Sequence, residues 1–137
     1  MMNFIKENWI SLLALAVSIV ALFKDIIKDL ITYKVNKKEK LQAEIKIKYI
    51  NKKIIISNYG KSSATDLRIF IDDTPIMEHN VFKVYADNID FSLLTSNNSI
   101  GIKHLEYMGI KPNYKVKVIY NDEHKKDNMV EDVINIF

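Results

Sequence analysis

The amino-acid sequence predicts a mainly β protein, in which a small antiparallel β-sandwich or barrel follows one long N-terminal transmembrane α-helix. Three observations support this prediction. Residues 9–23 read WISLLALAVSIVALF and carry no charge. From Leu41 onward the apolar residues recur at every second position, which is the period of a strand. The remaining chain offers seven or eight short strand candidates at intervals of about 8–12 residues, as in all-β domains.

The first predicted element is the membrane helix. The hydrocarbon core of a bilayer is about 30 Å thick and takes about 20 helical residues to cross. The uncharged run is shorter than that, but apolar residues extend it on both sides, and no Gly or Pro interrupts residues 1–42. We therefore expect one helix from about Phe4 to near Asn36, with Trp9 at one membrane interface. The residues that extend the run are Phe4, Ile5, Ile26, Ile27, Leu30 and Ile31.

The small and polar residues of this helix share one face. They follow one another at spacings of three and four, which places them in a single stripe. In lipid, small residues let helix backbones approach and polar groups bond across the contact. The stripe predicts a helix–helix interface, and the alternative is a plain single-pass anchor. We call this stripe the seam; it contains Ser11, Ala14, Ser18, Ala21, Asp25, Lys28 and Thr32.

The basic residues that flank the helix predict its orientation. The N-terminal side offers Lys6 and the α-amino group, whereas residues 24–40 contain six lysines. The positive-inside rule then places the C-terminal domain on the cytoplasmic side of the cell membrane. A basic stretch beside a bilayer also contacts anionic headgroups. We expect such membrane-surface contacts from Trp9, Lys34, Lys37, Lys38 and Lys40.

A cleavable signal peptide is the alternative to a permanent anchor. Ala14-Leu15-Ala16 is similar to a signal-peptide cleavage site, with Lys6 before it. The apolar segment upstream of that site is too short for a signal peptide, which argues against cleavage.

The β-domain is predicted strand by strand. Residues 43–49 alternate between apolar and charged side chains, which is typical of a half-buried strand, and residues 51–53 are typical of a turn. Further strands are predicted at residues 54–57, 67–71, 81–85, 90–94, 100–105, 114–120 and 130–137, with turns or loops at 72–75, 95–99 and 121–128. The chain thus divides into a helix with a juxtamembrane extension (1–36), a basic linker (37–42) and a β-domain (43–137).

The aromatic residues of the β-domain are spread one or two per strand. Such dispersal favours a place in the core over an exposed platform that stacks nucleotide bases. The residues concerned are Tyr59, Phe70, Phe82, Tyr85, Phe91, Tyr107, Tyr114 and Tyr120.

One local pattern resembles a known family. Residues 54–69 read IIISNYGKSSATDLRI. They are similar to the N-x-G-x-x-x-A-x-x-L-x-I signature of bacterial immunoglobulin-like domains, including the cell-adhesion-related CARDB-type modules. Asn58 and Gly60 suit a tight turn with positive φ, and Ala64 is small enough for a close chain crossing. The resemblance covers about 20–30 residues and implies an immunoglobulin-like sandwich, but no activity.

Composition argues against several classes of site. The chain has no Cys, so it forms no disulfide and offers no thiolate. Twenty basic and 17 acidic residues give a formal charge of +3, and Arg68 is the only arginine, which argues against a nucleic-acid partner. His79, His104 and His124 lack metal-ligand spacing, and the glycines form no phosphate loop. We expect no enzyme, no metal and no cofactor.

These observations leave three functional hypotheses. The first is a membrane-anchored, non-enzymatic binding module that self-associates through the seam and offers its β-domain to a protein partner or small-molecule ligand. The second, by architectural analogy, is an oligomeric pore-forming effector of bacterial antiphage defence with a ligand-sensing β-domain. The third is an extracellular adhesion domain, which is how modules of the resembled family are usually used, and which the predicted orientation disfavours. The richness in Lys, Ile and Asn is typical of AT-rich coding and indicates a bacterial or phage source.

Overall fold

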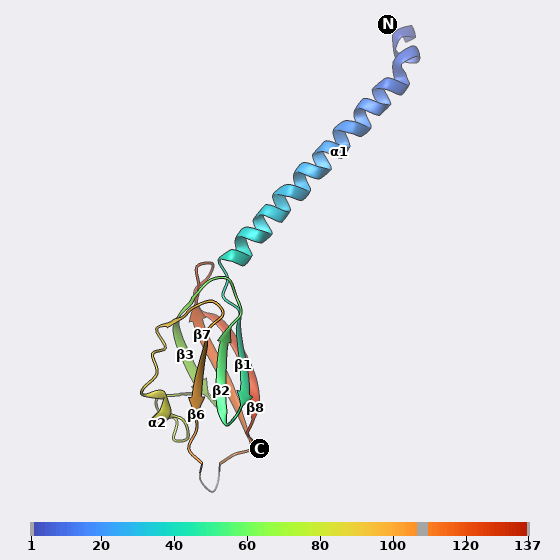
Figure 1. Cartoon of the computed structure of the whole chain (residues 1–137). Coiled ribbons are helices and arrows are strands. Elements are labelled where there is room, and N and C mark those ends of the chain that lie inside the picture. Colours follow the sequence, from blue (N-terminus) through green and yellow to red (C-terminus); the bar gives the residue numbers. More distant parts are fainter. Residues whose placement is uncertain (1, 107–109, 137) are drawn as a thin grey trace. The chain divides into compact units, whose positions relative to one another are not determined.

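The computed structural model describes residues 2–106 and 110–136, with side chains from Asn8 onward. The chain forms two compact units, Met1–Lys37 and Lys38–Phe137. The first consists of the helix α1 (Met2–Lys40), whose last turn belongs to the second unit, and the second is a β-domain (Figure 1).

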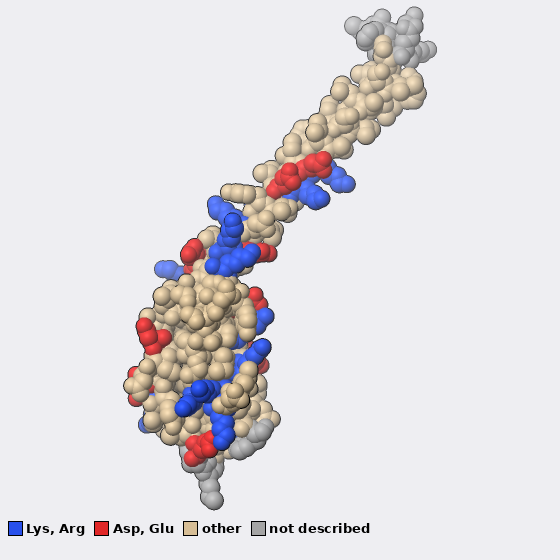
Figure 2. Space-filling view, viewed as in Figure 1, with Lys and Arg blue, Asp and Glu red and all other residues tan. Residues whose placement is uncertain are grey.

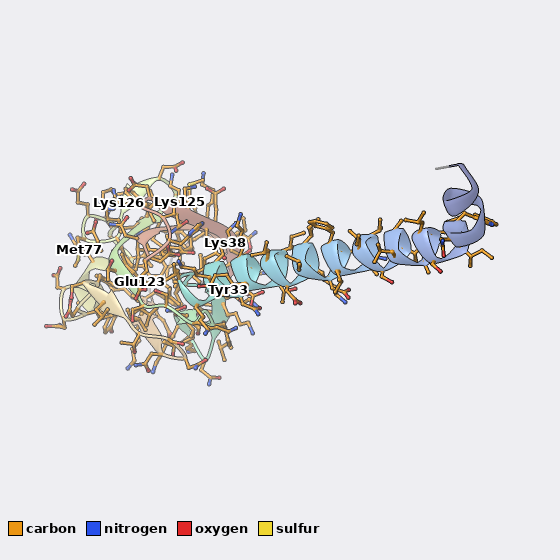
Figure 3. The ribbon with its side chains drawn as sticks, turned by 90° about the horizontal axis from the view of Figure 1, so that it is seen from above. Tyr33, Lys38, Met77, Glu123, Lys125 and Lys126 are labelled. Atoms are coloured by element: carbon orange, nitrogen blue, oxygen red, sulfur yellow. The ribbon has the colours of Figure 1, made fainter. Side chains whose placement is uncertain are left out.

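Helix α1 is long and apolar enough to cross a membrane. Its candidate span, Asn8–Lys40, contains an 18-residue window with a mean hydropathy of 2.3, and none of that window is buried. Figure 3 shows the side chains of α1 projecting from all sides of the helix. The helix covers the predicted range from Phe4 to Asn36 and continues to Lys40, so most of the stretch predicted as a linker is helical. The absence of Gly and Pro from this stretch explains the continuation.

The β-domain contains two antiparallel sheets in the part of the chain that the structure describes. The first has the strand order β1-β2-β6, and the second has the order β4-β3-β7-β8, with β5 paired to the start of β3. The strands are β1 (Ile45–Ile50), β2 (Lys53–Asn58), β3 (Ala64–Ile71), β4 (Thr74–Pro75), β5 (Leu93–Leu94), β6 (Ser99–Lys103), β7 (Asn113–Asn121) and β8 (Asn128–Asn135). The mainly β character predicted from the alternating pattern is confirmed.

The two sheets share one hydrophobic core. Burial alternates along β1, β2 and β7, as a sheet with one solvated face requires. In the first sheet Ile54 and Ile56 are fully buried, and in the second Val116 and Val118 are fully buried. Phe82 is the largest fully buried side chain, and its ring lies edge-on to Tyr114 with 5.4 Å between the ring centres. Burial of such aliphatic and aromatic surface is the main force that stabilises the domain.

Two predicted strands differ from the structure. Residues 81–85 were expected to form a strand, but α2 (Lys83–Ala86) is a single helical turn in this region. Phe82 and Ala86 are both buried and lie four residues apart, which is the spacing of one helix face. Residues 90–94 were also expected to form a strand, and only Leu93–Leu94 does so.

The aromatic residues are only partly core residues. Phe82, Tyr114 and Tyr120 are buried, whereas Tyr59 is 50% exposed and Tyr85 is 38% exposed. Phe70 and Phe91 are half-buried, and Tyr107 lies outside the described residues. The expectation that all of them fill the core is therefore wrong for Tyr59 and Tyr85.

Asn58 joins three separate segments of the domain. Its side chain is buried, and its Oδ1 accepts hydrogen bonds from the backbone N–H groups of Glu44 (3.1 Å) and Gly60 (2.9 Å). Its Nδ2 donates to the carbonyl oxygens of Ser62 (2.8 Å) and Leu94 (3.1 Å). We call this arrangement the Asn58 clasp. All the hydrogen-bonding capacity of the amide is used, which is how a buried polar side chain is made stable.

Gly60 is required by a close chain crossing and not by its backbone angle. Neither Asn58 nor Gly60 lies in the left-handed region of φ, so the expected left-handed turn is wrong. A Cβ atom at Gly60 would lie only 2.4 Å from the backbone nitrogen of Glu44 and 2.5 Å from the carbonyl oxygen of Gln42. Ala64 is fully buried where β3 pairs with Leu94. The segment before β1 thus passes directly over Gly60.

The start of the β-domain is also bonded to its last hairpin. The backbone N–H of Ala43 donates to the Asp122 carboxylate at 3.0 Å. The carbonyl oxygen of Ala43 accepts from the Tyr120 hydroxyl at 3.3 Å. These two bonds join residues 79 and 77 positions apart in sequence.

Candidate functional site

The seam residues all lie on α1 and are exposed. Two of their hydroxyl groups bond within the helix: Ser18 Oγ donates to the carbonyl oxygen of Ala14 at 2.8 Å, and Thr32 Oγ1 donates to that of Lys28 at 2.9 Å. Both hydroxyl hydrogens are therefore used inside the helix, and the oxygen lone pairs remain for a second helix. That the seam contacts another copy stays a prediction.

The predicted membrane-surface residues lie towards the two ends of the candidate span. Trp9 is 52% exposed near its start, and Lys34, Lys37, Lys38 and Lys40 are exposed in its last turns. Cationic side chains in the last turns of a helix also interact favourably with its dipole. Their contact with headgroups stays a prediction.

The outer face of the three-stranded sheet is basic. The burial pattern of β1 turns Lys46 and Lys48 outward, and the register places Lys53 and Lys103 on the same face. None of the three strands contains an acidic residue. Figure 2 shows lysine side chains gathered over the part of the domain where β2 and β6 lie in Figure 1. We call Lys46, Lys48, Lys53 and Lys103 the basic face.

Two lysines of the basic face oppose each other directly. Lys53 on β2 pairs with Lys103 on β6 in the antiparallel register. Side chains in such positions have Cβ atoms about 4.5–5.5 Å apart, and like charges there destabilise the sheet. Neither lysine forms an ion pair or side-chain hydrogen bond with any residue that the structure describes. Lys46, in contrast, pairs with Glu44 at 3.0 Å.

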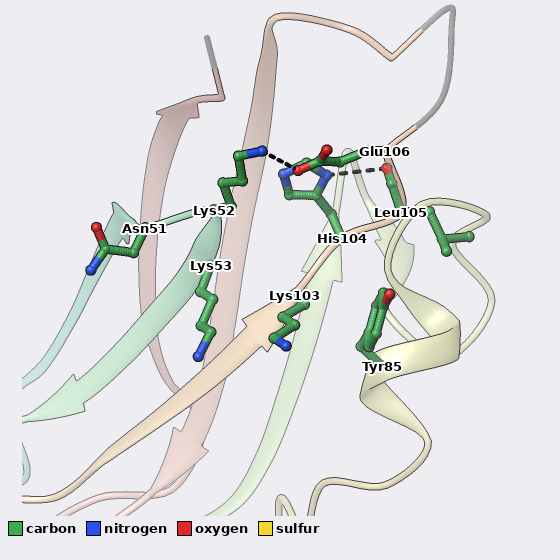
Figure 4. A pocket seen from close by; sticks show the side chains of 8 residues that line it. All are labelled: Asn51, Lys52, Lys53, Tyr85, Lys103, His104, Leu105 and Glu106. Atoms are coloured by element: carbon green, nitrogen blue, oxygen red, sulfur yellow. Dashed lines mark hydrogen bonds and ion pairs between the residues drawn. The ribbon is translucent and has the colours of Figure 1, made fainter.

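An open pocket lies beside this lysine pair. It has a volume of about 640 Å³ and sits where β1 turns into β2 and where β6 ends. In Figure 4, Lys53 and Lys103 lie side by side, and Tyr85 stands on α2 next to them. We call this cavity the end pocket; it is lined by Asn51, Lys52, Lys53, Tyr85, Lys103, His104, Leu105 and Glu106.

Hydrogen bonds fix one wall of the end pocket. His104 Nδ1 lies 3.1 Å from the carbonyl oxygen of Leu105, which can only accept, so Nδ1 carries the hydrogen. In the neutral ring, Nε2 then accepts from the Tyr49 hydroxyl at 2.6 Å. Lys52 and Glu106 form an ion pair at 2.7 Å, which raises the pKa of Lys52 and lowers that of Glu106. Burial and, to a lesser extent, the Glu106 charge raise the pKa of Tyr49.

The turn that carries Lys52 is conformationally unusual. Asn51 and Lys52 have φ values of 52° and 62°, as a two-residue type I′ hairpin requires. Asn suits the left-handed region, but Lys does not, and Gly is the usual residue at the second position. Lys52 therefore adopts an unfavourable backbone conformation, and its side chain lines the end pocket.

We expect Lys52→Gly to stabilise the domain by about 1 kcal/mol, since it removes the left-handed strain and loses only an exposed ion pair. Calorimetric unfolding of the full chain in detergent measures the change. Lys53→Gly, one residue later in an extended strand, serves as the control and is expected to destabilise the domain by about 1 kcal/mol. Equal effects of the two substitutions would contradict a conformational origin.

His79 and His104, which lack metal-ligand spacing in the sequence, are both half-buried. The His79 ring lies against Phe82 and Tyr114, with 5.3 and 5.6 Å between ring centres. Burial lowers the pKa of His79; to a smaller extent the Asp72 charge raises this pKa and the Lys111 charge lowers it further. Among the described residues, no three His, Asp or Glu side chains are grouped as a metal site needs.

The end pocket could not be predicted from the sequence. Its lining comes from the turn after β1, from α2 and from the residues after β6, and their proximity depends on strand register. The sequence does contain one signal for such a site, an aromatic residue with lysines nearby. The dispersal of the aromatic residues instead predicted that Tyr85 lies in the core, so its ring was not considered as part of a site.

Comparison with known proteins identifies a family. A family of domains of unknown function (DUF8453) matches residues 7–136. The chain belongs to this family. No curated protein and no solved structure matches the chain. The match extends across both α1 and the β-domain, so the helix is part of what defines the family.

Proposed function

We propose that this DUF8453 chain is a membrane-anchored, non-enzymatic binding module. The observation that carries the proposal is the fully exposed apolar span of α1, directly followed by a β-domain with a basic face. Exposing the apolar side chains of such a helix to water is unfavourable, whereas the hydrocarbon core of a bilayer accommodates a helix of this length. The β-domain then supplies the surface that meets a ligand or partner.

We propose further that the β-domain is an immunoglobulin-like sandwich of the CARDB-like kind. Its strand order supports this assignment. If β1 to β8 are lettered A, B, C, C′, D, E, F and G, the sheets are A-B-E and C′-C-F-G. Immunoglobulin-type sandwiches divide their strands between two sheets in a similar way. The Asn58 clasp and Gly60 lie on the motif through which the sequence resembles those modules.

The β-domain is proposed to face the cytoplasm, and the lysines at the C-terminal end of α1 support that orientation. The chain contains no Cys, so a single introduced cysteine is the only thiol in the protein that a maleimide can label. Lys126→Cys lies in the exposed loop between β7 and β8. A membrane-impermeant maleimide should label it only after the cells are opened, whereas Asn3→Cys should be labelled in intact cells. The reverse pattern would refute the cytoplasmic placement.

The module is proposed to self-associate through the seam. Asp25 and Lys28 support this, because ionisable groups in a span usually face another helix. We expect Ala14→Leu with Ser18→Leu to weaken association of the full chain by about tenfold, since bulky side chains keep the backbones apart. Light scattering across a dilution series in mild detergent measures it.

The matched control for the seam variant is Ala16→Leu. Ala16 is an exposed small residue in the same stretch of α1, but it lies on the opposite face of the helix. The Ala16→Leu variant should associate as strongly as the unaltered chain. A full chain that is monomeric at every concentration, or an equal loss in both variants, would show that the seam is not an interface.

A pore-forming effector remains the second candidate function, because the seam would place Asp25 and Lys28 along the axis of a bundle. Induced expression should then arrest growth, and Asp25→Asn or Lys28→Gln should remove that toxicity while membrane retention is unchanged. Harmless expression of the unaltered chain at high level, with the seam shown to associate, favours the binding module instead.

A further inference from the structure

We propose that the end pocket binds a phosphate-bearing small molecule, with Lys53 and Lys103 as the groups that hold the phosphate. This inference names the ligand class of the binding module proposed above and rests on that function. It depends on three observations: an unneutralised lysine pair, an excess of positive charge and an exposed aromatic ring.

The lysine pair is the first observation. Lys53 and Lys103 oppose each other across β2 and β6, and no described residue neutralises either ammonium group. The arrangement costs stability in the ligand-free domain. A di- or polyanion between the two groups converts this repulsion into attraction. Two point charges with rotatable donors suit the several oxygens of a phosphate group.

The charge balance of the pocket is the second observation. Among the described residues, three lysines and one carboxylate, that of Glu106, line it, so this lining carries a formal excess of two positive charges when histidine is counted as neutral. Glu106 is engaged with Lys52 at 2.7 Å and leaves the Lys53–Lys103 pair uncompensated. A singly charged carboxylate would balance half of this excess, whereas a phosphate or pyrophosphate group balances it fully.

The aromatic ring is the third observation. Tyr85 is 38% exposed on α2, although the other aromatic residue of that segment, Phe82, is fully buried. Figure 4 shows the Tyr85 ring beside the lysine pair and below the His104–Leu105 segment. An exposed ring next to a cationic site offers a stacking surface for a planar group that is attached to the phosphate. The volume of about 640 Å³ lies within the range of small-molecule sites.

The test is calorimetric titration of the full chain in nanodiscs of phosphatidylcholine, at constant ionic strength, with inorganic pyrophosphate and with ATP as probes. We expect saturable binding of both probes and tighter binding of ATP. Lys53→Gln and Lys103→Gln should each weaken binding by at least about tenfold. Tyr85→Ala should weaken ATP binding and leave pyrophosphate binding unchanged.

The matched control is Lys48→Gln. Lys48 belongs to the basic face but does not line the end pocket. The Lys48→Gln variant should change the affinity by less than about twofold, because this exposed ammonium group lies outside the pocket lining and is partly screened by salt. An equal loss in Lys48→Gln, or absence of saturable heat with both probes at millimolar concentration, would overturn the proposal.

The melting temperature of the ligand-free chain provides a second readout. Lys53→Gln and Lys103→Gln should each leave it unchanged or raise it, since either one removes the repulsion. A fall in both variants would show that the lysines stabilise the fold, and it would overturn their role as ligand groups.

A second pair of nanodiscs separates soluble phosphates from phospholipid headgroups. When phosphatidic acid replaces part of the phosphatidylcholine, competition with pyrophosphate shows that a headgroup reaches the pocket, and unchanged affinity shows that the source is soluble. Failure of both probes leaves the membrane and seam measurements of the proposed function intact, so the two failures are distinguishable.

Discussion

Gly60→Ala is expected to destabilise the β-domain by about 3 kcal/mol and to lower its melting temperature by roughly 10–20 °C. The added methyl would lie 2.4 to 2.6 Å from three backbone atoms of residues 42–44. Backbone cannot rotate away as a side chain can, so the segment before β1 has to move. That movement also breaks the bond from Tyr59 N–H to the Glu44 carbonyl oxygen, which is 2.8 Å long. Differential scanning calorimetry of the full chain in detergent measures the loss.

Gly101→Ala is the matched control for Gly60→Ala. Gly101 lies in β6, and a Cβ there would meet only the ends of two side chains, Ile55 Cδ1 at 3.3 Å and Lys53 Cδ at 3.6 Å. Both can rotate, and alanine loses less conformational entropy than glycine on folding. We expect a change of less than about 1 kcal/mol in either direction. Similar losses at Gly60 and Gly101 would show that crowding at Gly60 is not the cause.

Asn58→Asp is expected to cost about 3 kcal/mol at neutral pH, although it exchanges only NH₂ for oxygen. The new oxygen would face the carbonyl oxygens of Ser62 and Leu94, to which Nδ2 donates in the native clasp. Burial and these acceptors favour the protonated acid, so the pKa of this carboxyl in the folded chain rises above its value in the unfolded chain. The folded variant therefore holds its proton to higher pH than the unfolded chain. Its deficit should be smallest below about pH 4 and should grow as the pH rises through the folded pKa.

The deficit in Asn58→Asp is measured as the difference in unfolding free energy from the unaltered chain at each pH, which cancels the titration of other groups. Asn98→Asp is its control, because Asn98 is exposed and its Nδ2 donates to the Thr95 hydroxyl at 3.0 Å, a group that can donate in turn. The control should lose less than about 1 kcal/mol and show little pH dependence. A pH-independent deficit at Asn58 would contradict the donor role assigned to Nδ2.

The sequence was sufficient for α1 and for most strands because their patterns are local. Alternation along residues 43–49 and 114–120 predicted β1 and β7, and the charged segment 121–128 predicted the hairpin that joins β7 to β8. It failed at α2, where Val81 and Phe82 resemble a strand and only the burial of Ala86 reveals the helical spacing. A single turn of helix is held by its tertiary contacts, which have no local signal.

The candidate sites differ in the same way: one follows from a local sequence pattern, and the other depends on tertiary structure. The seam could be found because its residues recur along one helix. The end pocket could not, since the opposition of Lys53 and Lys103 follows from the register of β2 with β6 across more than 40 intervening residues. The sequence motif around Asn58 and Gly60 predicted a tight turn with positive φ. The structure shows that Gly60 is needed instead where two chain segments cross.

The bonds of Ala43 to the last hairpin set an order of events during synthesis. Ala43 cannot reach its partner until Asp122 has been made, 79 residues later. At about 5–20 residues per second, that delay is roughly 4–16 s. Helix α1 precedes Ala43 and has left the ribosome long before, while the β-domain still lacks the strands that close it. The apolar segment is therefore available to the membrane insertion machinery at a time when no folded domain competes for it or hinders its transfer.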